Sequence, residues 1–135
     1  MNIYTSFQSE FLMRQGFRLF ERSNYQLALE KFTQAYNLCA ENAFSSLWMG
    51  FCLNELEKYA EAQEKYLEAI SKVPDNVSLK AFLAISYMDQ GLDDDALKIL
   101  TPLVSLPKVS RPVSDSYGLC LLKLGKFEDA HKFLN

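Results

Sequence analysis

The chain has 135 residues, of which 49% are apolar and 23% are charged, and its net charge is −3. This composition is typical of one globular domain and not of a disordered chain. The negative charge argues against a surface for nucleic acid or an anionic membrane. No stretch approaches the ~20 apolar residues of a membrane span. The N-terminus lacks the basic start and the long apolar run of a secretory signal. The three cysteines fit a reducing compartment, so we expect a cytoplasmic protein.

A 34-residue period runs through the chain without insertion or deletion. A small residue occurs once in each period, at Gly16, Gly50, Ala84 and Gly118. Alanine follows each of them twelve residues later, and a large apolar residue stands four residues beyond that. A fixed period of this length indicates stacked units that bury their apolar faces against one another. Counted from residue 9, the predicted repeats cover residues 9–42, 43–76, 77–110 and 111–135, with the last one truncated.

Each repeat is predicted to form two antiparallel helices joined by a short turn. Asn42, Asn76 and Ser110 precede the first helix of the later repeats, where a side-chain oxygen can cap unpaired backbone amides. Pro102 should kink or shorten the sixth helix, because proline lacks the backbone amide. We expect an all-α solenoid of helix pairs that forms a single domain over residues 1–135, with residues 1–8 extending the first helix. The predicted helices are 7–22, 25–39, 43–56, 59–72, 77–90, 93–105, 112–124 and 127–134.

Residues with catalytic or metal-binding chemistry are sparse. His131 is the only histidine, and no glycine-rich phosphate loop, CxxC pair or HExxH motif occurs. Cys52 and Cys120 occupy the same repeat position, and Ser86 occupies it in the third repeat, which favours a small buried residue over a redox role. We therefore expect no enzymatic activity, no metal and no cofactor.

The first helix of each repeat is apolar on two faces. One face packs against the second helix, and the other lies about 140° away, where an ordinary amphipathic helix is polar. We expect this second face to bind a partner protein, with Trp48 as its hot spot, because a large exposed apolar patch marks an interaction site. Burial in the seams between repeats is the alternative interpretation. The candidate partner-binding residues are Met13, Phe17, Phe20, Phe44, Leu47, Trp48, Phe51, Phe82, Ile85, Met88, Leu119 and Leu122.

The whole pattern resembles the tetratricopeptide repeat, a 34-residue helix–turn–helix with small residues at positions 8, 20 and 27. The resemblance covers residues 9–135. It implies a right-handed α-solenoid whose first helices line a concave groove that holds the ligand. The tryptophan of position 4 is missing in every repeat, and Asp93 replaces the aromatic residue of position 17 in the third repeat.

The resemblance also bears on the ligand. Family members that bind the acidic tails of heat-shock chaperones use a clamp of Lys, Asn and Arg side chains. The matching positions here hold no charged residue, so we expect a hydrophobic or amphipathic segment instead. Acidic residues at the rim would favour a partner with flanking Lys or Arg, and the alternative is that they only keep the surface soluble. The clamp positions are Met13, Phe17, Trp48, Ser78 and Phe82, and the rim acids are Glu10, Glu21, Glu55 and Asp89.

In size and repeat number the chain resembles the cytosolic tetratricopeptide-repeat chaperones of type III secretion systems, which mask subunits before export. Two alternatives stay open: a passive scaffold in a multiprotein complex, or the N-terminal fragment of a longer repeat array, which the truncated fourth repeat favours. A homodimer is a further expectation, because the apolar residues Ile3, Tyr4 and Phe7 and the uncapped C-terminal helix each offer surface.

Overall fold

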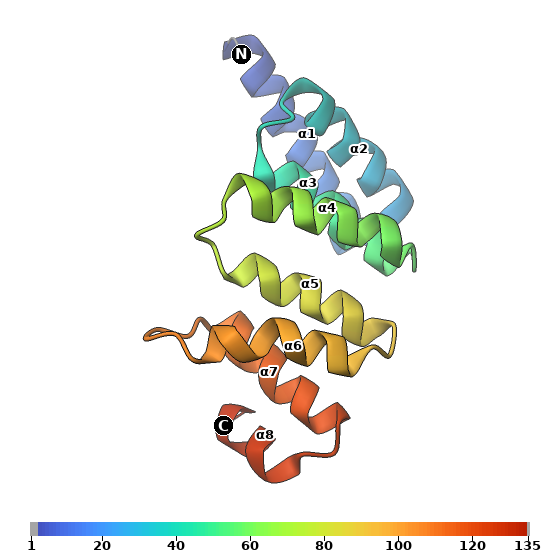
Figure 1. Cartoon of the computed structure of the whole chain (residues 1–135). Helices are drawn as coiled ribbons and strands as arrows, with labels where there is room; N and C mark the ends of the chain where they lie inside the picture. The colour runs from blue at the N-terminus through green and yellow to red at the C-terminus, as the bar shows by residue number, and fades with distance from the viewer. Residues whose placement is uncertain (1–2, 135) are drawn as a thin grey trace. The chain divides into compact units, whose positions relative to one another are not determined.

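The computed structural model describes residues 3–134, which form eight α-helices and no strand (Figure 1). The helices are α1 (Ile3–Glu21), α2 (Tyr25–Leu38), α3 (Ala43–Glu55), α4 (Tyr59–Lys72), α5 (Ser78–Asp89), α6 (Asp93–Val104), α7 (Arg111–Lys123) and α8 (Phe127–Leu134). The all-α prediction is confirmed, and nearly every predicted boundary is correct to within one residue. The exception is α1, which begins four residues before its predicted start because no glycine or proline interrupts that segment.

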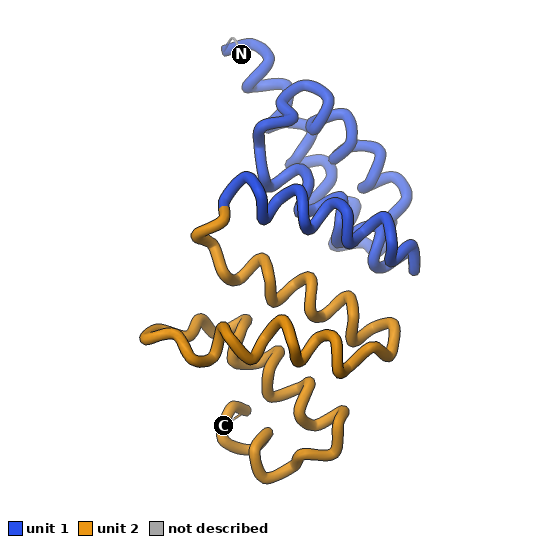
Figure 2. Tube along the Cα trace, in the orientation of Figure 1, with its two compact units in different colours: residues 1–73 blue, residues 74–135 orange. Residues whose placement is uncertain are grey.

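The chain divides into two compact units, residues 1–73 and residues 74–135 (Figure 2). In the first unit α1 packs against α2, α2 against α3, and α3 against α4. In the second unit α5 and α7 both pack against α6 and also contact each other, and α8 packs against α7. A single domain over 1–135 stays a prediction.

The close approach of paired helices explains the small residue in each period. A Cβ atom added at Gly16 would lie 2.4 Å from Cε1 of Phe32, and one added at Gly50 would lie 2.6 Å from Cε1 of Tyr66. These separations are shorter than any van der Waals contact, so each aromatic ring occupies the space that a side chain would need. The small residue of the first helix therefore packs against the large residue of the second helix in these two repeats.

The turns within the repeats share one backbone conformation. Gly91 and Gly125 have φ angles of 80° and 78°, and Ser23 and Glu57 hold the same repeat position with φ angles of 61°. L-residues rarely adopt this left-handed conformation, whereas glycine adopts it at no steric cost. The first two repeats therefore make the same turn with a less suitable residue.

The predicted helix caps are confirmed in part. Oδ1 of Asn42 accepts a hydrogen bond from the backbone amide of Phe44 at 2.9 Å, as an N-cap does. Ser110 stands at the N-cap of α7 without a side-chain cap bond, and its hydroxyl accepts a hydrogen bond from Ser78 at 3.0 Å. Asn76 was predicted as a cap and is not one, since Val77 precedes α5. Pro102 lies inside α6, which ends two residues later.

The three cysteines are free thiols, and two of them are core residues. Cys52 and Cys120 are fully buried, as is Ser86 at the same position of the third repeat. Burial raises the pKa of the Cys52 thiol to about 12, with a smaller effect from the charge of Glu55. A thiol with so high a pKa is unreactive at neutral pH, which agrees with the predicted packing role.

Candidate partner-binding surface

The structure separates the predicted partner-binding residues by exposure. Those exposed to solvent are Phe44, Leu119 and Leu122. Those partly buried are Phe17, Phe20, Trp48, Phe51, Phe82 and Ile85. Those buried are Met13, Leu47 and Met88.

The three buried side chains correct the expectation that all of these residues face solvent. Met13 packs in the core with Phe32 because it lies one turn before Gly16, on the stripe of α1 that faces α2. Met88 packs in the core of the second unit with Leu100. Leu47 is 6% exposed on a helix that is buried on most sides. These three residues belong to the buried core and offer no binding surface.

Four partly buried aromatic rings lie together in the first unit, and three of them contact the fourth, that of Trp48. The ring of Trp48 lies 4.8 Å from that of Phe17, 5.3 Å from that of Phe20 and 5.0 Å from that of Phe51, each in edge-to-face geometry. These residues come from α1 and α3, and we call them the aromatic cluster. The buried ring of Phe32 packs against Trp48 on the core side of the cluster, with the two ring centres 5.7 Å apart.

The aromatic cluster continues onto an exposed ring of α3. Phe44 is 60% exposed and lies four residues before Trp48, which in turn lies three residues before Phe51. Residues at this spacing share one helix face. Phe44, Trp48 and Phe51 therefore lie on one face of α3, and the rings of Trp48 and Phe51 contact each other.

The second unit presents a smaller apolar face. Leu119 and Leu122 are exposed and lie three residues apart on one side of α7. Phe82 and Ile85 are partly buried on α5, and Ile85 packs against the core of this unit. This face offers aliphatic contact area, but fewer of the rigid aromatic rings that usually dominate binding energy.

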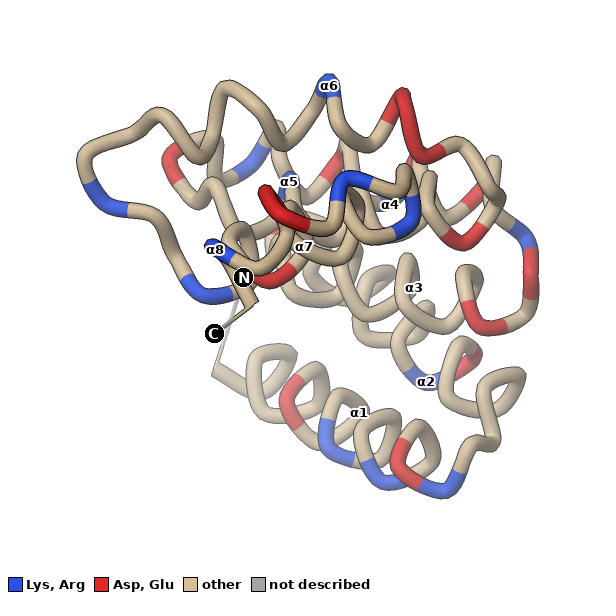
Figure 3. The backbone as a smooth tube through the Cα atoms, turned by 90° about the horizontal axis from the view of Figure 1, so that it is seen from below, with Lys and Arg blue, Asp and Glu red and all other residues tan. Residues whose placement is uncertain are grey.

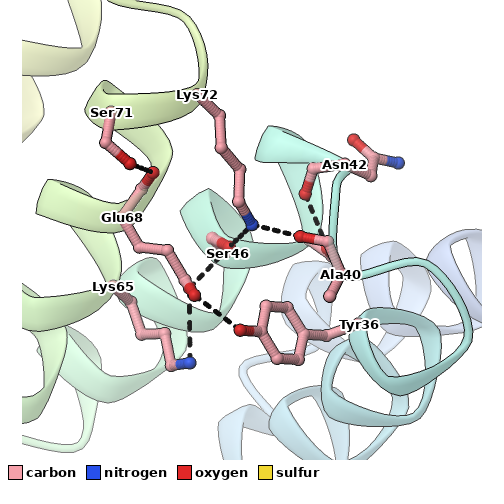
Figure 4. A network of polar contacts seen from close by, with 9 residues as sticks. Tyr36, Ala40, Asn42, Ser46, Lys65, Glu68, Ser71 and Lys72 are labelled. Carbon is pink, nitrogen blue, oxygen red and sulfur yellow. Dashed lines mark hydrogen bonds and ion pairs between the residues drawn. The ribbon is translucent and has the colours of Figure 1, made fainter.

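A polar network that the sequence did not reveal joins three helices of the first unit (Figure 4). The Tyr36 hydroxyl on α2 donates to Oε1 of Glu68 on α4 at 2.5 Å. The Ser46 hydroxyl on α3 donates to Oε2 of the same carboxylate at 2.9 Å. Lys65 forms an ion pair with it at 3.4 Å, and Lys72 donates to the Ser46 hydroxyl at 3.2 Å.

The electrostatics of this network favour a charged Glu68. Partial burial raises the pKa of the Glu68 carboxyl, but the hydrogen bonds from Tyr36 and Ser46 and the charges of Lys65 and Lys72 together lower it below its usual value. The two lysine ammonium groups also lie over the Tyr36 ring, at 4.3 and 5.1 Å from its centre. The network holds α2, α3 and α4 together and lies outside the aromatic cluster.

Charged residues are spread over both units, and α1 carries both signs (Figure 3). The acids predicted to form the rim are all exposed: Glu10, Glu21, Glu55 and Asp89. Within residues 3–134, no three histidine, cysteine or acidic side chains are placed to hold a metal ion. None of the described helices combines the length and the apolar character that crossing a membrane requires.

The geometry defines an all-α repeat protein built from antiparallel helix pairs. A family model described as tetratricopeptide repeat matches residues 53–106. A solved structure with the same fold is TTC0263, a thermophilic tetratricopeptide-repeat protein of Thermus thermophilus. It is 19% identical, with a TM-score of 0.82 over 93% of this chain and 71% of that chain. Residues 53–106 therefore match the tetratricopeptide-repeat family, which confirms the predicted resemblance there, and the solved structure has the same fold over most of the chain.

Other solved structures with this fold contain bound peptides. The first tetratricopeptide-repeat domain of Spaghetti (RPAP3), bound to the HSP90 peptide SRMEEVD, is 14% identical, with a TM-score of 0.74 over 87% of this chain and 94% of that chain. The second such domain of human RPAP3, in complex with the HSP70 peptide SGPTIEEVD, is 16% identical, with a TM-score of 0.74 over 86% and 97%. At these identities the likeness establishes the fold alone. No curated protein matches the chain in sequence.

Proposed function

We propose that this protein is an interaction module that binds an apolar or amphipathic segment of another protein and catalyses no reaction. The aromatic cluster carries the proposal, because Trp48 is partly exposed while three neighbouring rings fix its orientation. A ligand that covers rings already held in place loses little side-chain entropy on binding. Phe44 extends the same face and adds exposed aromatic area.

The chemistry of the first unit's surface supports an apolar ligand over an acidic one. Of the positions that clamp acidic tails in related proteins, Phe17 and Trp48 belong to the aromatic cluster and Met13 is buried. None of these side chains carries the positive charge that an ion pair with a carboxylate needs. The exposed Glu21 and Glu55 are the last residues of α1 and α3, the helices that carry the cluster. Their charges would attract Lys or Arg beside the apolar segment of the partner.

The biological role that we favour is a cytoplasmic chaperone for an apolar subunit, as in type III secretion. The free thiols of all three cysteines support a reducing compartment. The alternative is a passive scaffold, or a segment of a longer repeat array, within a multiprotein complex. A chaperone should co-purify with one apolar partner and self-associate or aggregate without it, whereas a scaffold should remain monomeric when alone.

A peptide titration tests the binding chemistry. Trp48 is the only tryptophan, so its fluorescence reports directly on the cluster. The first probe is an amphipathic helical peptide of leucine and lysine, about 16 residues long. The second is the acidic peptide SRMEEVD that the Spaghetti (RPAP3) structure contains. We expect the first peptide to shift the emission at micromolar concentration and the second to bind at least tenfold more weakly.

Alanine substitutions test whether the amphipathic peptide binds at the aromatic cluster. Phe17→Ala and Phe51→Ala together should weaken binding of the amphipathic peptide at least tenfold, because they remove two of the rings around Trp48. The matched control is Phe11→Ala, which removes an equally large ring that is 62% exposed on another face of α1. Equal effects of the cluster variant and the control, or stronger binding of the acidic peptide, would refute the proposed function.

A further inference from the structure

A second apolar surface lies on α1, away from the aromatic cluster. Ile3, Tyr4, Phe7 and Phe11 are 77%, 69%, 67% and 62% exposed. Tyr4, Phe7 and Phe11 follow one another at helical spacing, and with Ile3 they form what we call the N-terminal stripe. Phe11 and Phe17 are six residues apart and so point about 120° away from each other. Beside the stripe, a groove of about 440 Å³ between α1 and α2 is lined partly by Phe11 and Leu38.

The repeat pattern shows what kind of element fits this surface. Phe11 is the third residue of its repeat, and the equivalent residues Ser45 and Val113 are almost fully buried. Ser45 lies on α3, which packs against the preceding α2, and Val113 shares a core with Leu100 of the preceding α6. At this position of the fold, a helix packs against the first helix of the repeat. The N-terminal stripe therefore has the site for a helix but no helix on it among the described residues.

The last helix of a second copy does not fit the stripe. Where α7 packs on α6, Sγ of Cys120 donates to the Asp93 carbonyl at 3.1 Å, so the tenth repeat position meets the start of the covering helix. In α1 that position is Arg18, which is far larger than the fully buried cysteine.

We propose that the N-terminal stripe binds the N-terminal stripe of a second copy, with the two α1 helices antiparallel about a two-fold axis. In this arrangement Phe7 lies opposite Phe11 of the second copy, and the reverse contact follows by symmetry. The same register places the exposed Arg14 opposite Tyr4 of the second copy, within reach of a cation–π contact. A parallel arrangement would place Arg14 opposite Arg14 of the second copy and Arg18 opposite Arg18. Like charges would then face each other. The antiparallel arrangement separates the two Arg14 side chains by roughly 15 Å along the helix.

The size of the stripe suits a dimer contact. Three exposed aromatic rings and one isoleucine offer about 600 Å² of apolar surface on each copy, at roughly 150 Å² for each side chain. A standard interface buries about 800 Å² on each partner, and the groove lined by Leu38 adds to the stripe. This area is at the upper end of the largest apolar patch on a typical monomer, and patches of that size are often functional.

The test is analytical ultracentrifugation of the full chain at about 1 to 200 µM, which covers typical weak dimers. We expect a dimer for the wild-type chain. Phe7→Glu and Phe11→Lys should each weaken it at least tenfold, because each change disrupts both symmetric ring contacts. An equimolar mixture of the two variants should recover most of the affinity. In that heterodimer one contact becomes Glu opposite Lys and the other stays Phe opposite Phe.

A matched control is Phe44→Glu, which alters a ring of similar exposure on α3 and should leave the dimer unchanged within about threefold. Circular dichroism of every variant confirms that it is folded. A wild-type chain that stays monomeric at the highest concentration would overturn the proposal, as would variants that dimerise normally or a mixture without recovery. Oligomers that grow with concentration and are lost in Phe127→Glu would point to head-to-tail packing and also overturn it. Peptide binding by the aromatic cluster is measured separately, so failure of one proposal leaves the other standing.

Discussion

In the turns between paired helices, the backbone conformation of a single residue affects the stability of the fold. The turn of the second repeat carries Glu57 with a φ angle of 61°, whereas the equivalent turns of the last two repeats carry glycine. A side chain in the left-handed conformation costs roughly 1–2 kcal/mol. Glycine avoids that cost but adds about 0.5–1 kcal/mol of unfolded-state entropy. The net balance favours glycine.

We therefore predict that Glu57→Gly raises the free energy of unfolding by about 0.5–1 kcal/mol. Urea denaturation measures this change as a higher midpoint with an unchanged slope. The control is Gly91→Ala, which places a Cβ atom on a backbone with a φ angle of 80° and should lower stability by about 1 kcal/mol. A Glu57→Gly variant less stable than the wild type would show that the Glu57 side chain makes contacts worth more than the backbone strain.

At the scale of helices, the Glu68 network links α2, α3 and α4 through one carboxylate. Because the folded-state pKa of Glu68 is lowered from its usual value of 4.5, its contribution to stability is present above pH 4.5. That contribution is lost as the pH falls through the lower pKa of the folded state. We predict that Glu68→Gln lowers the free energy of unfolding by about 1 kcal/mol at neutral pH, and that the difference disappears in acid.

The measurement for this prediction is the urea midpoint of both proteins between about pH 3 and pH 7, a window in which carboxylates change charge. Tyr36→Phe should produce part of the same loss, because it removes the hydroxyl that donates to Glu68. The matched control is Glu64→Gln, which alters an exposed glutamate on the same helix. A difference between wild type and Glu68→Gln that persists unchanged at pH 3 would show that charge on Glu68 is not what stabilises the network.

The period alone predicts most of the helices, because it repeats the small residue, the turn and the large residue in fixed order. Gly50 and Tyr66 are an example: their spacing predicts the contact that the structure contains. The Tyr36–Glu68 contact was missed because it joins different positions of successive repeats, 32 residues apart, which no single-repeat pattern contains. The burial of Met13 was missed for a similar reason. Helical spacing defines two faces of α1, but not how far the core of the unit extends around it.

At the scale of the whole molecule, each helix depends on its sequence neighbours for stability, so protection should vary along the chain. Helix α3 packs between α2 and α4 and is buried along most of its length. Helix α8 has 8 residues, contacts α7, and buries only Ala130 among its side chains. The free energy that must be overcome to open α8 locally is therefore much smaller than that needed to expose α3.

Native-state hydrogen exchange followed residue by residue should resolve this gradient. We predict that the central amides of α3 exchange at least about 100-fold more slowly than those of α8, after correction for intrinsic rates. Helix α7 is the internal control, because it has 13 residues and packs against α5 and α6 as well as α8. Its amides should remain protected while those of α8 exchange. Equal protection in α8 and α3 would mean that the chain opens as one cooperative unit, contrary to nearest-neighbour stabilisation. Protection of α8 that rises with protein concentration would instead indicate that self-association covers the C-terminal helix, which the antiparallel α1 dimer does not do.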